Sequence, residues 1–379
     1  MISLQDVKDA QARIAPYVVR TPLLRIPALD APLGCQVYLK FEGFQVMGAF
    51  KIRGAMNKAL ALTPQQRSHG LVCASSGNHA QGVACAAQRL GVRSVIVMPT
   101  NANPVKLAGV KSFGGEVELV GTLSSQREAR AEELSREEGM VNIHPYADPY
   151  VAAGQGTIGL EIVADLPDAA AVAVPIGGGG LISGVATAVK GLSPHIRTIG
   201  VEPAGAPRYT RSRAEGRPVQ LESVQTIADG TRTDHANPDN FEMIQARVDD
   251  LCAVDDTYIR QAIRLLMDKA KLTVEPSGAL PVAAALAGAL SVKPEDKVVF
   301  VLSGGLRRFL CLCVKLLYVA LGQPAAFELP HKLAAFLRRS RIKHVAHFRP
   351  PVLLCHIGLQ EVAVFRAVAV RVPAHLVNR

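Results

Sequence analysis

Three glycine-containing segments hold the residues whose types and spacing suit chemistry. Residues 43–55 place Lys51 directly after Phe50 and between glycines. Residues 75–82 begin with two serines, and residues 177–180 are four consecutive glycines. A lysine amine is a nucleophile toward carbonyl compounds, whereas a glycine-rich turn at the start of a helix binds anions through backbone N–H groups. An isolated lysine is more often a solvated surface residue, so the other two segments must show whether Lys51 has a chemical role.

The glycine loop consists of Gly177, Gly178, Gly179 and Gly180. It follows the apolar run 171–176 and precedes the helical pattern 181–190, which places it at the carboxyl end of a predicted strand. No Cβ atom obstructs a close approach there, so several N–H groups and a helix N-terminus can face one phosphate. A tight turn is the alternative, but a turn needs fewer glycines, so the pattern favours phosphate binding.

The same glycines also match part of a dinucleotide-binding fingerprint. Gly178 and Gly180 are followed by Gly184, and Glu202 lies at the end of the next predicted strand. That arrangement is typical of a nucleotide-binding βαβ unit. A dinucleotide-binding protein is therefore a minor alternative, although it leaves Lys51 unexplained.

The second segment is a polar loop between a predicted strand and a predicted helix. Its first residues are Ser75, Ser76, Gly77, Asn78 and His79. The N–H groups at such a helix start suit an anion such as a substrate carboxylate. A helix that is merely capped by Ser or Asn is the alternative.

From residue 70 onward, short β-branched runs alternate with longer helical patterns. The predicted strands are 70–74, 94–98, 116–120, 171–175, 198–201 and 297–302. The predicted helices include 79–90, 124–138, 148–166 and 255–271, and Ser3 with Asp6 predicts a capped helix at the N-terminus. This alternation favours an α/β fold with parallel-rich sheets and helices on both faces.

Together, the three segments in this order resemble the fold-type II pyridoxal-phosphate (PLP) family, and specifically its serine/threonine dehydratase and serine racemase branch. Further matching segments are 142–146, 154–157, 200–203, 228–230, 274–278 and 303–305. The resemblance implies a two-domain, tryptophan synthase β-like architecture with the cofactor in the interdomain cleft. Residues 1–69 and 148–305 would form the large PLP-binding domain, and residues 70–147 the small domain.

The resemblance also implies a role for each segment. Lys51 binds the cofactor covalently, Phe50 lies against the pyridine ring, and Asn78 contacts the ring hydroxyl. Ser303 faces the pyridine nitrogen. The phosphate is bound by Gly177, Gly178, Gly179 and Gly180. The substrate is bound by Ser75, Ser76, Gly77, Asn78 and His79.

The implied reaction is the PLP-dependent α,β-elimination of L-threonine or L-serine-type β-hydroxy amino acids to a 2-oxo acid and ammonia. In this reaction the freed Lys51 amine removes the Cα proton. Ser76 leaves serine racemisation open as an alternative, because the racemases carry a serine there as an acid/base on the face opposite the lysine. A Ser76 that only caps the helix is equally compatible with the sequence.

Two further residues match a divalent-cation site of the racemases. Glu202 and the carbonyl group of Ala206 occupy two ligand positions, but Arg208 stands where an acid is usual. A guanidinium offers only hydrogen-bond donors and a positive charge, whereas a hard cation needs oxygen ligands. The resemblance therefore implies pyridoxal 5'-phosphate as the cofactor, while Arg208 argues against the divalent cation.

The composition changes sharply after residue 305. Residues 306–379 contain no Asp, and Glu328 and Glu361 are their only acids, so the formal net charge of +10 lies in this segment. We interpret this atypical basic tail as an out-of-frame continuation of the gene, with a genuine extension as the alternative. The family segment that it replaces normally supports Ser303, so a catalytically impaired PLP-binding protein is an alternative function.

Charge, cysteine use and hydropathy set the expectations for partners and location. Residues 1–305 are balanced in charge, which argues against specific nucleic-acid binding. The N-terminus lacks a secretory signal, no apolar stretch is long enough to span a membrane, and no CxxC pair occurs. We expect a cytoplasmic enzyme that acts on a small amino-acid substrate, and the resemblance implies a homodimer.

Overall fold

The computed structural model describes residues 1–305, which form an α/β fold with two sheets. The larger sheet has the strand order β1-β2-β10-β7-β8-β9. Its strands are β1 (Leu23–Arg25), β2 (Gln36–Phe41), β7 (Ala171–Pro175), β8 (Arg197–Pro203), β9 (Asp250–Val254) and β10 (Lys297–Leu302). All neighbouring strands are parallel except β1 and β2, so most of this sheet must be covered on both faces.

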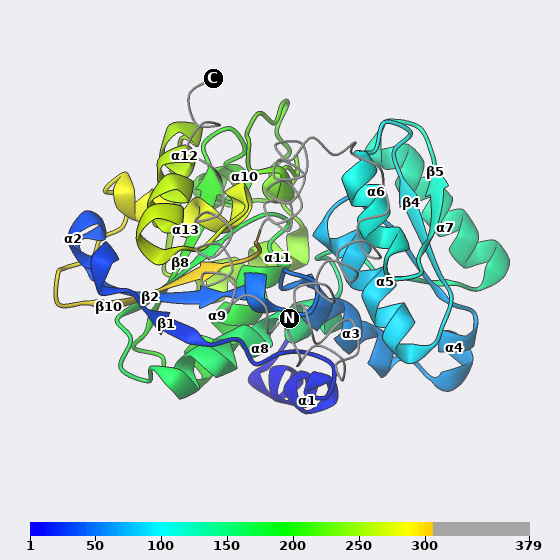
Figure 1. Cartoon of the computed structure of the whole chain (residues 1–379), viewed down its shortest axis with the longest axis horizontal. Helices are drawn as coiled ribbons and strands as arrows, with labels where there is room; N and C mark the ends of the chain where they lie inside the picture. The colour runs from blue at the N-terminus through cyan, green and yellow to red at the C-terminus, as the bar shows by residue number, and fades with distance from the viewer. Residues whose placement is uncertain (306–379) are drawn as a thin grey trace, which may run out of the picture. The chain divides into compact units, whose positions relative to one another are not determined.

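Apolar side chains cover both faces of the larger sheet. The helices that pack on it are α8 (Pro149–Asp165), α9 (Gly180–Leu192), α11 (Pro238–Arg247), α12 (Asp256–Leu265) and α13 (Pro276–Leu286). On β10, Val298, Phe300 and Leu302 join the core that includes α12 and α13. Val299 and Val301 point the other way, as strand geometry requires, and join the core with α8 and α9. Figure 1 shows these two helix pairs on opposite sides of the sheet.

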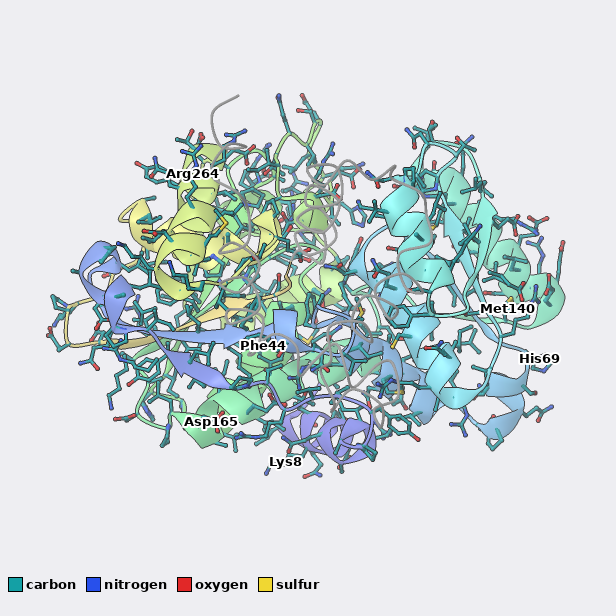
Figure 2. All side chains as sticks on the ribbon, in the orientation of Figure 1. Lys8, Phe44, His69, Met140, Asp165 and Arg264 are labelled. Carbon is teal, nitrogen blue, oxygen red and sulfur yellow. The ribbon has the colours of Figure 1, made fainter. Side chains whose placement is uncertain are left out.

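The smaller sheet is entirely parallel and has the order β5-β4-β3-β6. Its strands are β3 (Leu71–Ala74), β4 (Ser94–Met98), β5 (Glu116–Leu119) and β6 (Val141–Asn142), and its helices are α5 (Asn78–Leu90), α6 (Pro104–Lys111) and α7 (Ser124–Glu138). Cys73 and Ile96 pack with α5, whereas Val72 packs with α7 on the opposite face. Figure 2 shows His69 and Met140 near this sheet and Asp165 at the end of α8, which packs on the larger sheet.

The remaining elements connect or flank the two sheets. They are α1 (Leu4–Ile14), η1 (Pro27–Leu29), α2 (Asp30–Leu33), η2 (Glu42–Phe44), α3 (Lys51–Ala61), α4 (Pro64–Ser68), α10 (Arg208–Glu215), η3 (Asp229–Thr231) and η4 (Leu266–Ala270). The predicted cap of α1 is confirmed, because the Ser3 side chain accepts from the Asp6 N–H and the Asp6 carboxylate accepts from the Ser3 N–H. No helix within residues 1–305 has the length and apolarity of a membrane span.

The predicted α/β class and all six predicted strands are confirmed, with small differences at their ends. Four strands were missed, namely β1, β2, β6 and β9. Strand β2 was missed because it contains Lys40, a charged residue that breaks the apolar pattern yet is fully buried. The expectations for residues 306–379 lie outside the described residues.

Helices α3, α8 and α9 meet backbone to backbone. A Cβ atom on Gly154 of α8 would lie 2.6 Å from the carbonyl oxygen of Arg53 on α3. A Cβ atom on Gly184 of α9 would lie 2.1 Å from the carbonyl oxygen of Ala152 on α8. Only glycine permits such a close approach. The spacing of the three helices is therefore fixed, and both α3 and α9 begin at segments where the sequence predicts the site.

A buried cluster of charged side chains joins α3 to β2, η2 and α8. The Arg53 guanidinium binds both oxygens of Glu42, at 2.8 and 2.9 Å, and both oxygens of Glu161, at 2.6 and 3.0 Å. Lys40 forms an ion pair with Glu161 at 2.6 Å, and the Thr21 hydroxyl donates to Glu42. Removing one partner would leave a buried charge uncompensated, so the cluster holds the first turn of α3 in place.

The helix stack generates a stability prediction. Gly184→Ala should lower the free energy of unfolding by about 1–3 kcal/mol, because the added Cβ must push α9 away from α8. Gly191→Ala on the same helix is the matched control, since the atoms nearest to its Cβ belong to the Leu4 side chain, at 3.0–3.3 Å, and not to a backbone. Urea denaturation of both variants measures the difference. Equal stability of the two variants would contradict a backbone-limited helix spacing.

Candidate active site

A pocket lies at the carboxyl ends of the central strands of both sheets, where the loops after β3, β7 and β10 converge. The sequence-predicted residues that line it are Phe50, Lys51, Ser75, Ser76, Gly77, Asn78, His79, Gly177, Gly178, Gly179, Gly180 and Ser303. The structure thus brings together segments that are far apart in the sequence. Glu202 and Ala206 do not line this pocket.

Lys51 is the first residue of α3, and its amine faces the pocket. Its Nζ donates to the Pro145 carbonyl oxygen at 2.7 Å and lies 5.2 Å from the centroid of the Phe50 ring. Desolvation lowers the pKa of Lys51 to about 8, although the negative charge of Glu275 opposes the shift. A substantial fraction of this amine is therefore neutral, and nucleophilic, near physiological pH.

Ser303 and Phe50 are joined through the backbone. The Phe50 N–H donates to the Ser303 carbonyl oxygen at 3.1 Å. Backbone hydrogen bonds also hold the next two residues. The Gly305 N–H donates to the Gly48 carbonyl oxygen at 3.0 Å, and the Glu275 N–H donates to the Gly304 carbonyl oxygen at 3.1 Å. The described residues alone therefore fix the end of β10 beside the start of α3.

Asn78 is oriented by a residue that the sequence analysis did not single out. Its Nδ2 donates to both carboxylate oxygens of Glu275, at 2.9 and 3.0 Å. Burial raises the pKa of Glu275, and the hydrogen bonds from Asn78 oppose that shift. Because the amide NH2 group faces the carboxylate, the amide oxygen is left to face other groups. The available signal was the position of Glu275 just before Pro276, at the start of α13.

His79 supports the polar loop and carries no charge. Its Nε2 lies 2.6 Å from the carbonyl oxygen of Ile143, which can only accept, so Nε2 carries the proton. Burial lowers the pKa of His79 to about 3, so the ring is neutral at physiological pH. Ser75 stabilises the same loop, since its hydroxyl accepts from the Gly77 N–H at 3.3 Å. Ser76 also lines the pocket.

Tyr146 packs against the glycine loop and was also missed. A Cβ atom on Gly178 would lie 2.2 Å from the Tyr146 ring, so the ring lies directly on the loop. The Asn240 side-chain amide donates to the carbonyl oxygens of both Tyr146 and Gly178, at 3.1 and 2.8 Å. The loop leads into the N-terminus of α9, whose partial positive charge favours an anion in the pocket.

The structure gives no support to Glu202 and Ala206 as metal ligands. Arg208 Nη1 donates to the Ala206 carbonyl oxygen at 2.9 Å, and Nη2 lies 3.7 Å from Glu202 Oε1. The Glu202 carboxylate also accepts from the N–H groups of Tyr209 and Thr210, at 3.0 and 2.7 Å. Among residues 1–305, no group of three His, Cys, Asp or Glu side chains is placed to hold a metal ion. The Arg208 guanidinium thus already donates to the Ala206 carbonyl oxygen and lies beside the Glu202 carboxylate.

An ion pair at the rim of the pocket joins α6, beside the smaller sheet, to η3. Lys106 Nζ lies 2.5 Å from Asp229 Oδ2, and both residues line the pocket. Their side chains are 31% and 63% exposed, so water competes for both charges. Such a pair contributes about 0–1 kcal/mol.

The sequence profile described as pyridoxal-phosphate dependent enzyme matches residues 14–304. The chain belongs to this family. An L-threonine ammonia-lyase from Thermotoga maritima is 43% identical over 305 residues, which are 80% of this chain and 76% of that protein. A serine racemase from Oryza sativa subsp. indica is 40% identical over 306 residues, which are 80% of this chain and 90% of that protein.

Solved structures agree with this family assignment. Maize serine racemase has a TM-score of 0.80 and 40% identity, and the match covers 83% of this chain and 97% of that chain. The threonine deaminase from T.th. has a TM-score of 0.77 and 46% identity, and the match covers 81% of this chain and 99% of that chain. The expected fold-type II architecture is confirmed.

The pocket of this pyridoxal-phosphate enzyme contains groups that complement its cofactor. The amine of Lys51, whose pKa is lowered to about 8, suits an aldehyde, and the ring of Phe50 suits the face of a pyridine. The N–H groups of Gly177, Gly178 and Gly179 have no acceptor among the described residues, so they are available to a phosphate. Pyridoxal 5'-phosphate therefore fits the residues present.

The pKa of Lys51 generates a prediction about pH. The rate at which pyridoxal phosphate attaches to the cofactor-free protein should rise with pH and level off above a midpoint near 8, because only the neutral amine attacks an aldehyde. Stopped-flow absorbance measures this rate, with Nα-acetyl-lysine amide as the unperturbed reference. A rate that continues to rise through about pH 10, as the reference should, would contradict a lowered Lys51 pKa.

Proposed function

We propose that this chain removes water and ammonia from a small β-hydroxy amino acid such as L-threonine or L-serine, releasing a 2-oxo acid. The observation that carries the proposal is the position of Lys51, whose amine has a lowered pKa and shares one pocket with the polar loop 75–79 and the glycine loop. The relatives named L-threonine ammonia-lyase support the reaction class.

Each part of the pocket has a proposed binding role. Lys51 holds the cofactor, Phe50 lies against its ring, and Asn78 contacts the ring hydroxyl. The glycine loop binds the phosphate. The Ser303 hydroxyl faces the pyridine nitrogen and, being neutral, does not force that nitrogen to stay protonated. When bound, the cofactor draws electrons from the Cα atom of the substrate.

The protein side of the reaction is proton transfer and orientation. The N–H groups of loop 75–79 at the start of α5 bind the substrate carboxylate. Lys51, released from the cofactor when substrate binds, takes the Cα proton, and its desolvated position favours the neutral form that can do so. The β-hydroxyl group leaves as water with one proton, which balances the proton that Lys51 takes from Cα. The dehydrated product is released, and hydrolysis of the C=N bond in its imine form gives ammonia and the oxo acid, so no oxidant is required.

Serine racemisation is a second candidate activity. Ser76 lines the same pocket as Lys51, and the second acid/base that inversion requires would act from the opposite face of the substrate. The relatives named serine racemase favour this candidate. Other parts of the proposal are a homodimer and domains made of residues 1–69 with 148–305 and of residues 70–147, which the resemblance implies, and a cytoplasmic location, which the pattern of cysteines favours.

Oxo-acid release tests the main proposal. The purified chain should release 2-oxo acid and ammonia from one or more members of a panel of β-hydroxy amino acids. Lys51→Ala should abolish this release and the absorbance of lysine-bound cofactor, whereas Lys58→Ala on the same helix should retain both. Lys58 is a suitable control because it pairs with Asp148 away from the pocket. If borohydride reduction trapped the cofactor on another lysine of Lys51→Ala, the assignment of Lys51 as the cofactor-binding lysine would be wrong.

A second measurement separates dehydration from racemisation. Ser76→Ala should lower D-serine formation by about 10²-fold or more, the usual contribution of a general acid/base, while dehydration falls far less. Only inversion needs a proton on the second face, which is the physical reason for the difference. Chiral chromatography and oxo-acid assays on the same samples give the two rates. Equal losses would show that Ser76 has no separate role in racemisation.

A further inference from the structure

The carbonyl groups of the glycine loop are held on one side by a set of buried donors. Arg208 Nη2 donates to the Ile176 carbonyl oxygen at 2.9 Å, and Arg208 Nε donates to the Gly177 carbonyl oxygen at 3.0 Å. The Gly178 carbonyl oxygen accepts from the Tyr209 hydroxyl and from Asn240 Nδ2, both at 2.8 Å. Three successive peptide groups are therefore fixed in orientation by side chains that lie behind the loop.

This arrangement determines where the N–H groups point. In a planar trans peptide the N–H of one residue points away from the carbonyl oxygen of the residue before it, and the described backbone contains no cis peptide bond. The N–H groups of Gly177, Gly178 and Gly179 thus point away from Arg208, Tyr209 and Asn240. These N–H groups have no acceptor among the described residues, and all three glycines line the pocket.

Arg208 is itself firmly held, which makes it a rigid support. Its side chain is fully buried, and Nη1 also donates to the carbonyl oxygens of Ala206 and Thr233, both at 2.9 Å. The buried carboxylate of Glu202 lies 3.7 Å away and balances its charge. A planar guanidinium can serve several carbonyl groups at fixed angles, which a lysine ammonium on a flexible stem does not do.

We propose that Arg208 is a positioning residue for the cofactor phosphate, which acts by holding the carbonyl groups of Ile176 and Gly177 so that the loop N–H groups are set toward the phosphate before the cofactor binds. This inference rests on the proposed role of the glycine loop. Arg208 does not line the pocket, so it acts through the loop. Its effect is to remove the need to reorient the loop on binding, which raises affinity for the phosphate specifically.

The test compares two cofactor forms that differ only in the phosphate. Arg208→Met in the full chain should lower the affinity for pyridoxal 5'-phosphate by about 10- to 100-fold, whereas the affinity for pyridoxal, which lacks the phosphate, should change by less than about twofold. Titration of the cofactor-free protein, followed by absorbance, gives both dissociation constants. Equal losses for both ligands would show that Arg208 is only a structural residue and would overturn the proposal.

Arg213→Met is the matched control. Arg213 lies on the same helix α10 and also binds backbone carbonyl groups, those of Ile244 and Val248, but it does not contact the glycine loop. Its loss should lower the melting temperature without changing the ratio of the two affinities. A change in that ratio as large as that in Arg208→Met would contradict a specific role for Arg208.

Two further variants keep the test decisive. Arg208→Lys retains the charge but not the fork of donors, so it should behave like Arg208→Met, and full recovery of the affinity ratio would overturn the orientation argument.

If Arg208→Met does not fold, Tyr209→Phe removes a single donor from Gly178 and should weaken pyridoxal phosphate binding several-fold while sparing pyridoxal. If the wild-type chain binds neither ligand, the proposed function fails rather than the role of Arg208.

Discussion

The direct backbone contact between α3, α8 and α9 is the constraint on which the site depends. Lys51 opens α3 and the glycine loop opens α9, so the distance between the amine and the phosphate-binding groups is set by how closely these helices approach. Gly154 and Gly184 remove the side chains that would separate them. The larger sheet then places Ser303 at the end of its central strand β10, beside the start of α3.

Some polar groups around the pocket are placed to face a ligand. Others hold these ligand-facing groups in a fixed orientation. Glu275 orients the Asn78 amide, and the Ile143 carbonyl orients the His79 ring. The donors behind the glycine loop do the same for its peptide groups. A pocket built in this way needs little rearrangement when a small charged ligand enters.

Much of this arrangement was predictable from local sequence patterns. The strand–loop–helix positions of the polar loop and the glycine loop follow from apolar runs that end at small residues, and both loops line the pocket. Partnerships between distant segments were not predictable, because neither composition nor spacing indicates that Glu275 meets Asn78 or that Arg208 reaches Gly177. Strand β2 was missed for a related reason, because the charge of its buried Lys40 is balanced by Glu161, which lies far away in the sequence on helix α8.

The two kinds of ion pair in this enzyme differ in how they respond to dissolved salt. The Lys106–Asp229 pair at the rim is open to water, so mobile ions within a Debye length of about 8 Å at physiological ionic strength screen it. The Arg53 cluster lies out of reach of such ions. A higher ionic strength should therefore weaken the Lys106–Asp229 pair at the rim of the pocket and leave the Arg53 cluster on α3 unchanged. Entry to the pocket and the position of Lys51 should then respond differently to salt.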